Sequence, residues 1–156
     1  IQATTGVASV ILDALGYAES RQIEAGTRPV TIALGGHTIG LATCYDVRFP
    51  GLFTQLAELG AELVVLPASW APGEAKLHQW RTLVTARAMD STCFVVAVDQ
   101  SVPPVAADGR TPTGIGHSLV VDPTGDVLLE LGDRAAARRI GSQTQSFIDW
   151  SKLLFD

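Results

Sequence analysis

Two apolar runs of strand length, separated by one helical segment, most limit the folds open to this chain. Residues 62–70, ELVVLPASW, form a continuous apolar run typical of a strand buried on both faces, and residues 93–100, CFVVAVDQ, are of the same kind. Residues 74–90 lie between them and predict a helix, because apolar residues recur there at helical spacing. Those residues are Leu77, Trp80, Leu83 and Val84. A strand, a helix and a strand in succession predict an α/β fold.

Shorter elements are expected on both sides of this unit. Residues 29–43 alternate apolar and polar residues around a Gly-Gly pair, which predicts two strands joined by a tight hairpin. Residues 50–60 predict a helix that starts at a proline and stops at a glycine. Residues 117–131 predict a second hairpin that turns at residues 122–125, and residues 101–116 a surface loop. The buried face of the helix over 50–60 is expected to consist of Leu52, Phe53, Leu56 and Leu59.

The chain is expected to form one domain over residues 1–156, because neither an internal repeat nor a linker is visible. Its length permits a hydrophobic core, and 47% hydrophobic with 17% charged residues is a globular composition. The pattern weakens from residue 132 onward. The tail over residues 132–156 is expected to be either an ordinary terminal helix or a segment docked at a subunit interface.

Charge and residue usage exclude several classes of partner. A net charge of −5 argues against a nucleic-acid surface, and no apolar stretch is long enough to span a bilayer. Cys44 and Cys93 lie in or beside strand-like sequence with no secretion signal, so reduced thiols in a cytoplasmic protein are expected. His37, His78 and His117 show no ligand spacing with each other or with the cysteines, so neither a metal site nor a cofactor is expected.

Cys44 is the residue on which a functional interpretation depends. In LATCYDVRFPGLF, residues 41–53, it follows a strand directly, where a cysteine is more often a small buried apolar residue. Two features favour a nucleophile instead. A strand-to-helix turn exposes a side chain at the carboxyl edge of the sheet, and it leaves backbone N–H groups, that of Tyr45 first, available to an oxyanion. Asp46 and Arg48 are expected to form an ion pair across this turn or to be ordinary surface charges.

The same stretch resembles the nucleophile region of the carbon–nitrogen hydrolase (nitrilase) superfamily. The form CYDVRFP, residues 44–50, is similar to the amidase branch that includes omega-amidase and deaminated-glutathione amidase. The likeness continues through HQWRTLVTARAMDSTCFVVAVDQ and GIGHSLVVDPTGDVL and covers residues 10–131. It implies a nitrilase-like α-β-β-α sandwich, of which this chain supplies the second half, and a homodimer.

The resemblance also implies a role for individual residues. Cys44 corresponds to the nucleophile that forms a thioester with an amide or nitrile carbon, and the backbone amide of Tyr45 to the oxyanion donor. Glu19, otherwise a solvent-facing loop acid, corresponds to a glutamate that positions the substrate and the catalytic lysine. Trp70 lies where the family lines its substrate pocket, although a core role competes. Arg48 is expected to receive a substrate carboxylate or to pair with its neighbouring acid. The expected substrate is a linear amide of a small carboxylic acid.

The chain departs from the family pattern at two catalytic positions. The family uses a glutamate base, a lysine and the cysteine, and the base belongs to the first half of the fold. The position of the lysine is filled by Ala8, or by Ser9 if one residue is deleted, and the lysines present, Lys76 and Lys152, lie elsewhere in the pattern. We therefore expect the glutamate and the lysine elsewhere in the functional molecule. The alternative is a catalytically inactive nitrilase-fold interaction subunit or fragment.

A glutaminase-type cysteine hydrolase is a further alternative. It requires a histidine paired with an acid late in the chain. The sequence HSL at residues 117–119 supplies no adjacent carboxylate, so a Cys-His-Glu triad is not expected.

Overall fold

The computed structural model describes residues 26–102 and 114–134, and these form one mixed sheet with helices. The six strands are hydrogen-bonded in chain order, β1 to β6. The strands are β1 (Val30–Leu34), β2 (His37–Leu41), β3 (Leu63–Ala68), β4 (Phe94–Asp99), β5 (Leu119–Val121) and β6 (Val127–Glu130). The helices are the 3₁₀ turn η2 (Cys44–Arg48), α2 (Pro50–Glu58) and α3 (Lys76–Ser91). The α/β prediction is confirmed.

Strands β2, β3 and β4 are parallel and form the centre of the sheet. Helices α2 and α3 connect them in turn, which is the connection that parallel neighbours require. Two antiparallel hairpins extend this centre, β1 with β2 and β5 with β6. The first turns at Gly35 and Gly36, whose φ angles of +58° and +85° suit the hairpin turns that need two left-handed residues. Both predicted hairpins are confirmed.

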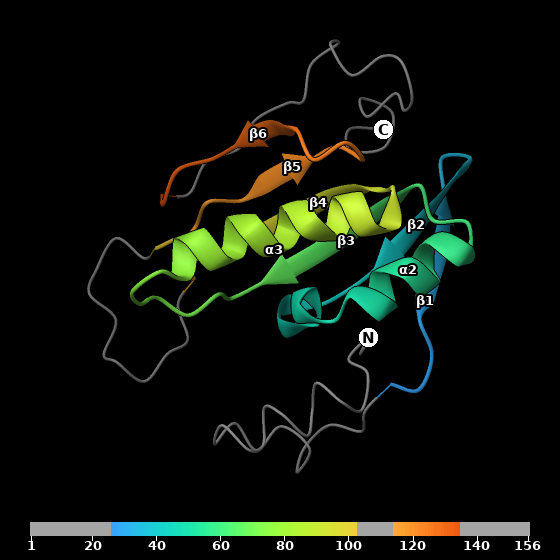
Figure 1. The fold of residues 1–156 in the computed structure, drawn as a ribbon, viewed down its shortest axis with the longest axis horizontal. Coiled ribbons are helices and arrows are strands. Elements are labelled where there is room, and N and C mark those ends of the chain that lie inside the picture. Colours follow the sequence, from blue (N-terminus) through green and yellow to red (C-terminus); the bar gives the residue numbers. More distant parts are fainter. Residues whose placement is uncertain (1–25, 103–113, 135–156) are drawn as a thin grey trace.

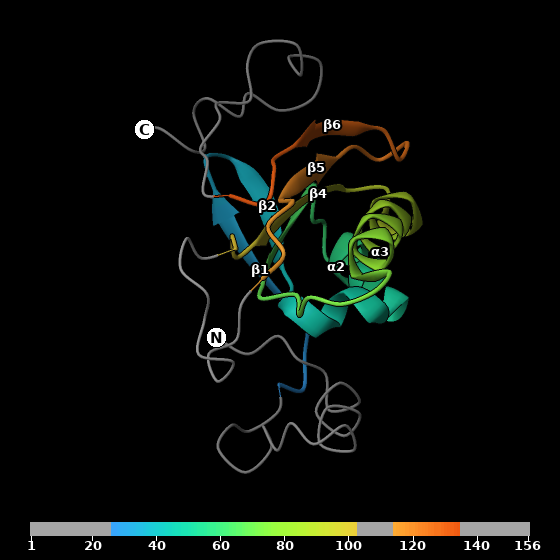
Figure 2. The ribbon, with the colours of Figure 1, turned by 90° about the vertical axis from the view of Figure 1, so that its left-hand side faces the viewer.

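Helices α2 and α3 pack on the same face of the sheet (Figures 1 and 2). Phe53 of α2 and Trp80 of α3 are fully buried there against β3 and β4. Leu52, Leu56 and Val84 are buried with them, as their spacing predicted. Leu59 is a correction: it is 54% exposed, because α2 ends at Glu58 and the chain turns away before Leu59 reaches the core.

The opposite face of the sheet is also apolar. Ile39, Leu63 and Phe94 lie in one row across β2, β3 and β4, with Leu41, Val65 and Val96 packed against them. On the same face Ile32 and Val98 are 43% and 49% exposed. No helix within residues 26–102 and 114–134 covers this face (Figure 2). Among the described residues, helices therefore cover only one of the two faces of the sheet.

Several predictions fall outside the described residues. They concern Glu19, the positions of Ala8 and Ser9, Lys152, most of the loop over 101–116 and the tail from residue 135. Among the described residues, no helix is both long and apolar enough to cross a membrane.

Candidate active site

Cys44 lies at the carboxyl end of β2, at the first position of η2. Because β2, β3 and β4 are parallel, the residues that follow all three strands meet at this edge of the sheet. The side chain of Cys44 is half-buried, so it is not enclosed by the core. Its φ of +46° is in the left-handed region, which is uncommon for a residue other than glycine.

The turn after Cys44 is held by Asp46. The carboxylate Oδ2 of Asp46 accepts the Thr43 N–H at 2.9 Å, and the Asp46 N–H donates to the Thr43 carbonyl oxygen at 2.9 Å. Asp46 is fully buried, so it is not an ordinary surface charge. The N–H of Tyr45 makes no backbone hydrogen bond to another described residue, as expected for the start of a helix. The role of this N–H as the oxyanion donor stays a prediction.

Arg48 packs between aromatic rings at the same edge. Its guanidinium carbon is 5.2 Å from the centroid of the Tyr45 ring and 5.2 Å from that of Trp70. Its Nη2 donates to Oε1 of Gln79 on α3 at 2.9 Å. Its Nε is buried without a hydrogen-bond partner among the described residues. The guanidinium of Arg48 therefore carries N–H groups that can donate hydrogen bonds to an anionic group.

Trp70 follows β3 and is only 4% exposed. Its ring is 5.4 Å from that of Trp80, and its indole N–H donates to the Lys76 carbonyl oxygen at 3.1 Å. The Nζ of Lys76 is 5.5 Å from the Trp70 ring. Trp70 therefore belongs to the core, and its ring also lies against the cationic groups of Arg48 and Lys76. A substrate contact for Trp70 stays a prediction.

Cys93 has a different environment from Cys44. It is 1% exposed at the start of β4, and its Sγ donates to the Ala61 carbonyl oxygen at 3.0 Å. Burial raises the pKa of the Cys93 thiol, which keeps it protonated. Cys44 and Cys93 do not form a disulfide with each other. Cys44 is therefore the more exposed of the two cysteines, and its role as the nucleophile stays a prediction.

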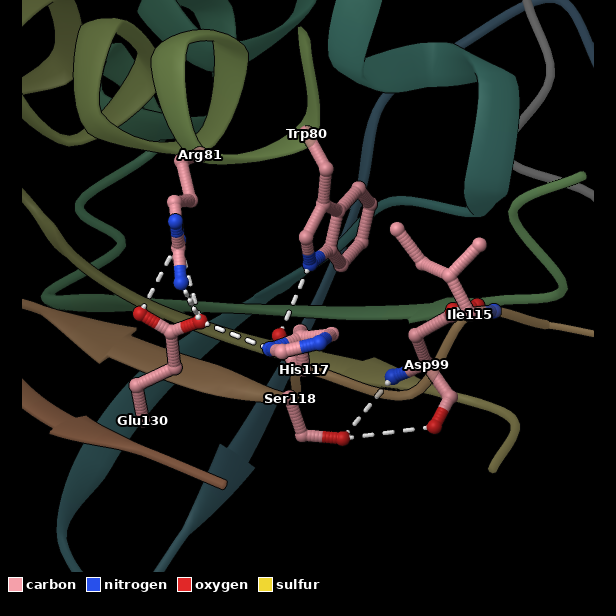
Figure 3. Close-up of polar contacts among 7 residues, drawn as sticks. All are labelled: Trp80, Arg81, Asp99, Ile115, His117, Ser118 and Glu130. Atoms are coloured by element: carbon pink, nitrogen blue, oxygen red, sulfur yellow. Dashed lines mark hydrogen bonds and ion pairs between the residues drawn. The ribbon is translucent and has the colours of Figure 1, made fainter. Parts of the chain in front are cut away.

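The pairing of His117 corrects one expectation. Its Nδ1 lies 2.9 Å from Oε1 of Glu130, which Arg81 also binds at 2.7 Å (Figure 3). A carboxylate therefore does pair with His117, because the β5–β6 hairpin brings Glu130 beside it. A triad with Cys44 still does not form, because three strand spacings, about 14 Å, separate β2 from β5. His37 pairs with Glu62 at 3.0 Å.

Within residues 26–102 and 114–134, no cluster of three or more His, Cys, Asp or Glu side chains is arranged to hold a metal ion.

Two buried polar residues at this edge were not predicted. Arg87 of α3 donates to the carbonyl oxygen of Val47 in η2, and Asp99, at the end of β4, accepts the Trp70 N–H. For Arg87 a signal existed, since it lies on the same helical stripe as Trp80 and Val84. For Asp99 the only signal was its place as an acid at the end of an apolar run.

Comparisons with known proteins agree with this arrangement of an α/β sheet and a cysteine at its carboxyl edge. The carbon–nitrogen hydrolase family matches residues 9–140. A hydrolase of Mycobacterium tuberculosis is 44% identical over 127 residues, which cover 78% of this chain and 45% of that protein. The deaminated glutathione amidase of Escherichia coli is 41% identical over 116 residues, covering 74% and 41%.

Solved structures of nitrilase-superfamily proteins are also similar to this chain. Saccharomyces cerevisiae Nit3, a member of branch 10 of the nitrilase superfamily, has a TM-score of 0.65 at 30% identity, covering 77% of this chain and 42% of Nit3. A mutant of the amidase from Nesterenkonia sp. AN1, which shows covalent addition of the acetamide moiety of fluoroacetamide at the active-site cysteine, has a TM-score of 0.63 at 30% identity. That match covers 75% of this chain and 42% of the amidase.

The fold is part of a nitrilase-type α/β domain. The chain belongs to the carbon–nitrogen hydrolase family. It spans less than half the length of the curated relatives described above. The predicted family is confirmed, and so is the prediction that the chain covers only part of the fold.

Proposed function

We propose that the intact protein hydrolyses the C–N bond of a linear amide of a small carboxylic acid, with Cys44 as the nucleophile. The observation that carries the proposal is the φ of +46° at Cys44, in the turn directly after β2. Strained backbone at a non-glycine residue persists where the surroundings impose it, and it clusters at functional sites. The covalent adduct at the active-site cysteine of the Nesterenkonia amidase supports the same kind of chemistry.

In the proposed reaction a general base takes the thiol proton, and the sulfur of Cys44 attacks the amide carbon. As the C–S bond forms, the carbonyl electron pair moves onto oxygen, where the Tyr45 N–H donates to it. The C–N bond then breaks, the nitrogen takes the proton from the base, and ammonia leaves. Water attacks the thioester and gives a proton to the same base. The C–S bond breaks, which releases the carboxylic acid and restores the thiol.

The glutamate base and the lysine of this mechanism are assigned to a part of the molecule outside residues 1–156. Two observations support that assignment. The chain spans 45% and 41% of the two curated relatives described above, and one apolar face of the sheet has no described helix over it. Glu19 is proposed to help position the substrate and this lysine.

Arg48 is proposed to bind a carboxylate of the substrate, with Trp70 as the adjoining wall. Arg48 lies four residues after Cys44, and its buried Nε lacks a hydrogen-bond partner among the described residues. A carboxylate accepts two parallel N–H bonds from a guanidinium, which would favour amides that carry a second acidic group.

The protein is further proposed to act in the cytoplasm as a homodimer. The resemblance to the amidase branch supports the dimer. The absence of a disulfide between the two cysteines fits a reducing compartment.

The test is alkylation of the intact protein by iodoacetamide, with ammonia release from candidate amides as the activity. The buried Cys93 is replaced, Cys93→Ala, so that one of the two cysteines of residues 1–156 remains. We expect complete modification of Cys44 to abolish ammonia release. Unchanged release after complete modification rejects Cys44 as the nucleophile. An unmodified protein that releases no ammonia from any amide would instead favour the inactive interaction subunit.

A further inference from the structure

Asp99 is the last residue of β4 and is only 5% exposed. Its two carboxylate oxygens have separate partners. Oδ1 accepts the Trp70 N–H at 2.7 Å, and Oδ2 accepts the Ile115 N–H at 2.7 Å. Trp70 follows β3, whereas Ile115 precedes β5. One buried side chain at the end of β4 therefore joins the backbone that follows β3 to the backbone that leads into β5, the two strands on either side of β4.

The backbone around Asp99 is closely fitted to this arrangement. The Asp99 N–H donates to Oγ of Ser118 at 3.1 Å, and that hydroxyl lies 3.3 Å from the Asp99 carbonyl oxygen (Figure 3). The Gly116 N–H donates to the Gln100 carbonyl oxygen at 2.9 Å. At Gly114 a Cβ would lie 1.9 Å from the Gln100 carbonyl oxygen and 2.7 Å from Oδ2 of Asp99. Only a glycine at position 114 therefore allows the backbone to lie this close to the Asp99 carboxylate.

The chemistry of the contacts requires a carboxylate at this position. Both oxygens accept from backbone N–H groups, whereas an asparagine has one acceptor oxygen and would aim its NH₂ group at the second donor. Burial raises the pKa of Asp99, and the hydrogen bonds from Trp70 and Ile115 oppose that shift. A buried charge is costly unless it is well hydrogen-bonded, so its position is closely defined.

Trp70 connects Asp99 to the candidate active site. The Trp70 ring lies 5.2 Å from the Arg48 guanidinium, and Arg48 follows Cys44 by one turn of η2. A shift of the Trp70 backbone would therefore move the wall against which Arg48 packs. The peptide of Cys44 itself is held separately, by the Asp46 contacts to Thr43.

We propose that Asp99 is a positioning residue: its carboxylate fixes the backbone of Trp70 against the strand entering at Ile115 and thereby sets the substrate-binding wall beside Arg48. The proposal rests on the proposed function for its effect on substrate binding. It assigns Asp99 no contact with the reacting atoms. Loss of its carboxylate is expected to weaken substrate binding more than it slows the chemical step.

The test compares Asp99→Asn and Asp99→Ser with Asp126→Asn in the intact protein. Asp126 is an exposed acid in the β5–β6 turn, so it undergoes the same chemical change away from the site. The probes are succinamic acid as the amide and iodoacetamide as a small reagent for Cys44. For Asp99→Asn we expect KM to rise about tenfold, with kcat and the rate of Cys44 alkylation within about threefold of wild type. The Asp126→Asn variant is expected to match wild type.

Near-ultraviolet circular dichroism of the Trp70–Trp80 pair is the second readout, and it does not depend on activity. A changed band in Asp99→Asn, with an unchanged far-ultraviolet spectrum, supports the positioning of Trp70 even if no amide is cleaved. An unchanged band together with an unchanged KM overturns the proposal. Parallel losses of kcat and alkylation rate, or failure of both Asp99 variants to fold, also overturn it, because Asp99 would then be a general structural residue.

Discussion

The guanidinium of Arg87 donates from Nη1 to the carbonyl oxygen of Val47, 3.0 Å away, and so joins α3 to the turn that carries Cys44. Arg87 is 8% exposed, and its Nη2 also pairs with Asp90 at 2.6 Å. This places a charged side chain on the buried face of a helix. Arg87 is therefore a charged donor to a backbone carbonyl oxygen of a fully buried residue.

Replacement Arg87→Met is expected to lower the free energy of unfolding by about 2 kcal/mol, because it leaves the buried carbonyl oxygen without its charged donor. Arg81→Met on the same helix is the matched control, since Arg81 is 48% exposed and its pair with Glu130 is worth about 0.5–1 kcal/mol. Urea denaturation of the intact protein measures both. Equal losses in the two variants would contradict a special role for the Arg87 contact.

The left-handed backbone of Cys44 predicts an unusual order of stability among its variants. We expect Cys44→Gly to be more stable than Cys44→Ala by about 1 kcal/mol, because an added Cβ is disfavoured at a φ of +46°. At Cys93, which is not among the residues with positive φ, the order should reverse, since glycine loses more backbone entropy. Thermal unfolding of the four variants tests this. The same order at both positions would argue against strain at Cys44.

The strands and helices were predictable because burial imposes a period on the sequence. The runs that became β3 and β4 and the spacing that placed Trp80 in the core needed no tertiary information. The prediction that Leu59 is buried was wrong, because the spacing of apolar residues does not say where a helix ends. Of the candidate site, only the position of Cys44 and its neighbours at a strand-to-helix turn was predictable. The contact of His117 with Glu130 depends on the register of the β5–β6 hairpin. The contact of Asp99 with Trp70 depends on how the segments after β4 and β3 meet in the folded protein.

The close approach at Gly114 predicts that no larger residue is tolerated there. We expect Gly114→Ala to lower the free energy of unfolding by about 2–3 kcal/mol, because its Cβ would overlap the Gln100 carbonyl oxygen at 1.9 Å and force the backbone to move. Gly51→Ala in α2 is the control. No atom lies within 4 Å of a Cβ at Gly51, so the change should be neutral or stabilising by up to about 1 kcal/mol. Two equally tolerated substitutions would show that the entry to β5 is loosely packed.

The contacts of Glu130 predict how stability depends on pH. Burial acts to raise the pKa of Glu130, but hydrogen bonds from Arg81 and His117 outweigh it and hold the pKa below the ordinary glutamate value of 4.5. A carboxyl with a lowered pKa in the folded state stabilises the protein fully above the unfolded pKa, and this contribution is lost as the pH falls through the folded value.

Wild type should therefore exceed Glu130→Gln in stability at pH 7, by about 1 kcal/mol or less because Arg81 is half exposed, and the difference should shrink as the pH falls below 4.5. Urea denaturation of both proteins at pH 7, 5 and 3 measures the difference. Glu74→Gln is the control, because Glu74 is exposed and makes no hydrogen bond or ion pair with another described residue. A difference for Glu130→Gln that is constant or grows with acid would mean that the Arg81 and His117 contacts do not stabilise the ionised carboxylate.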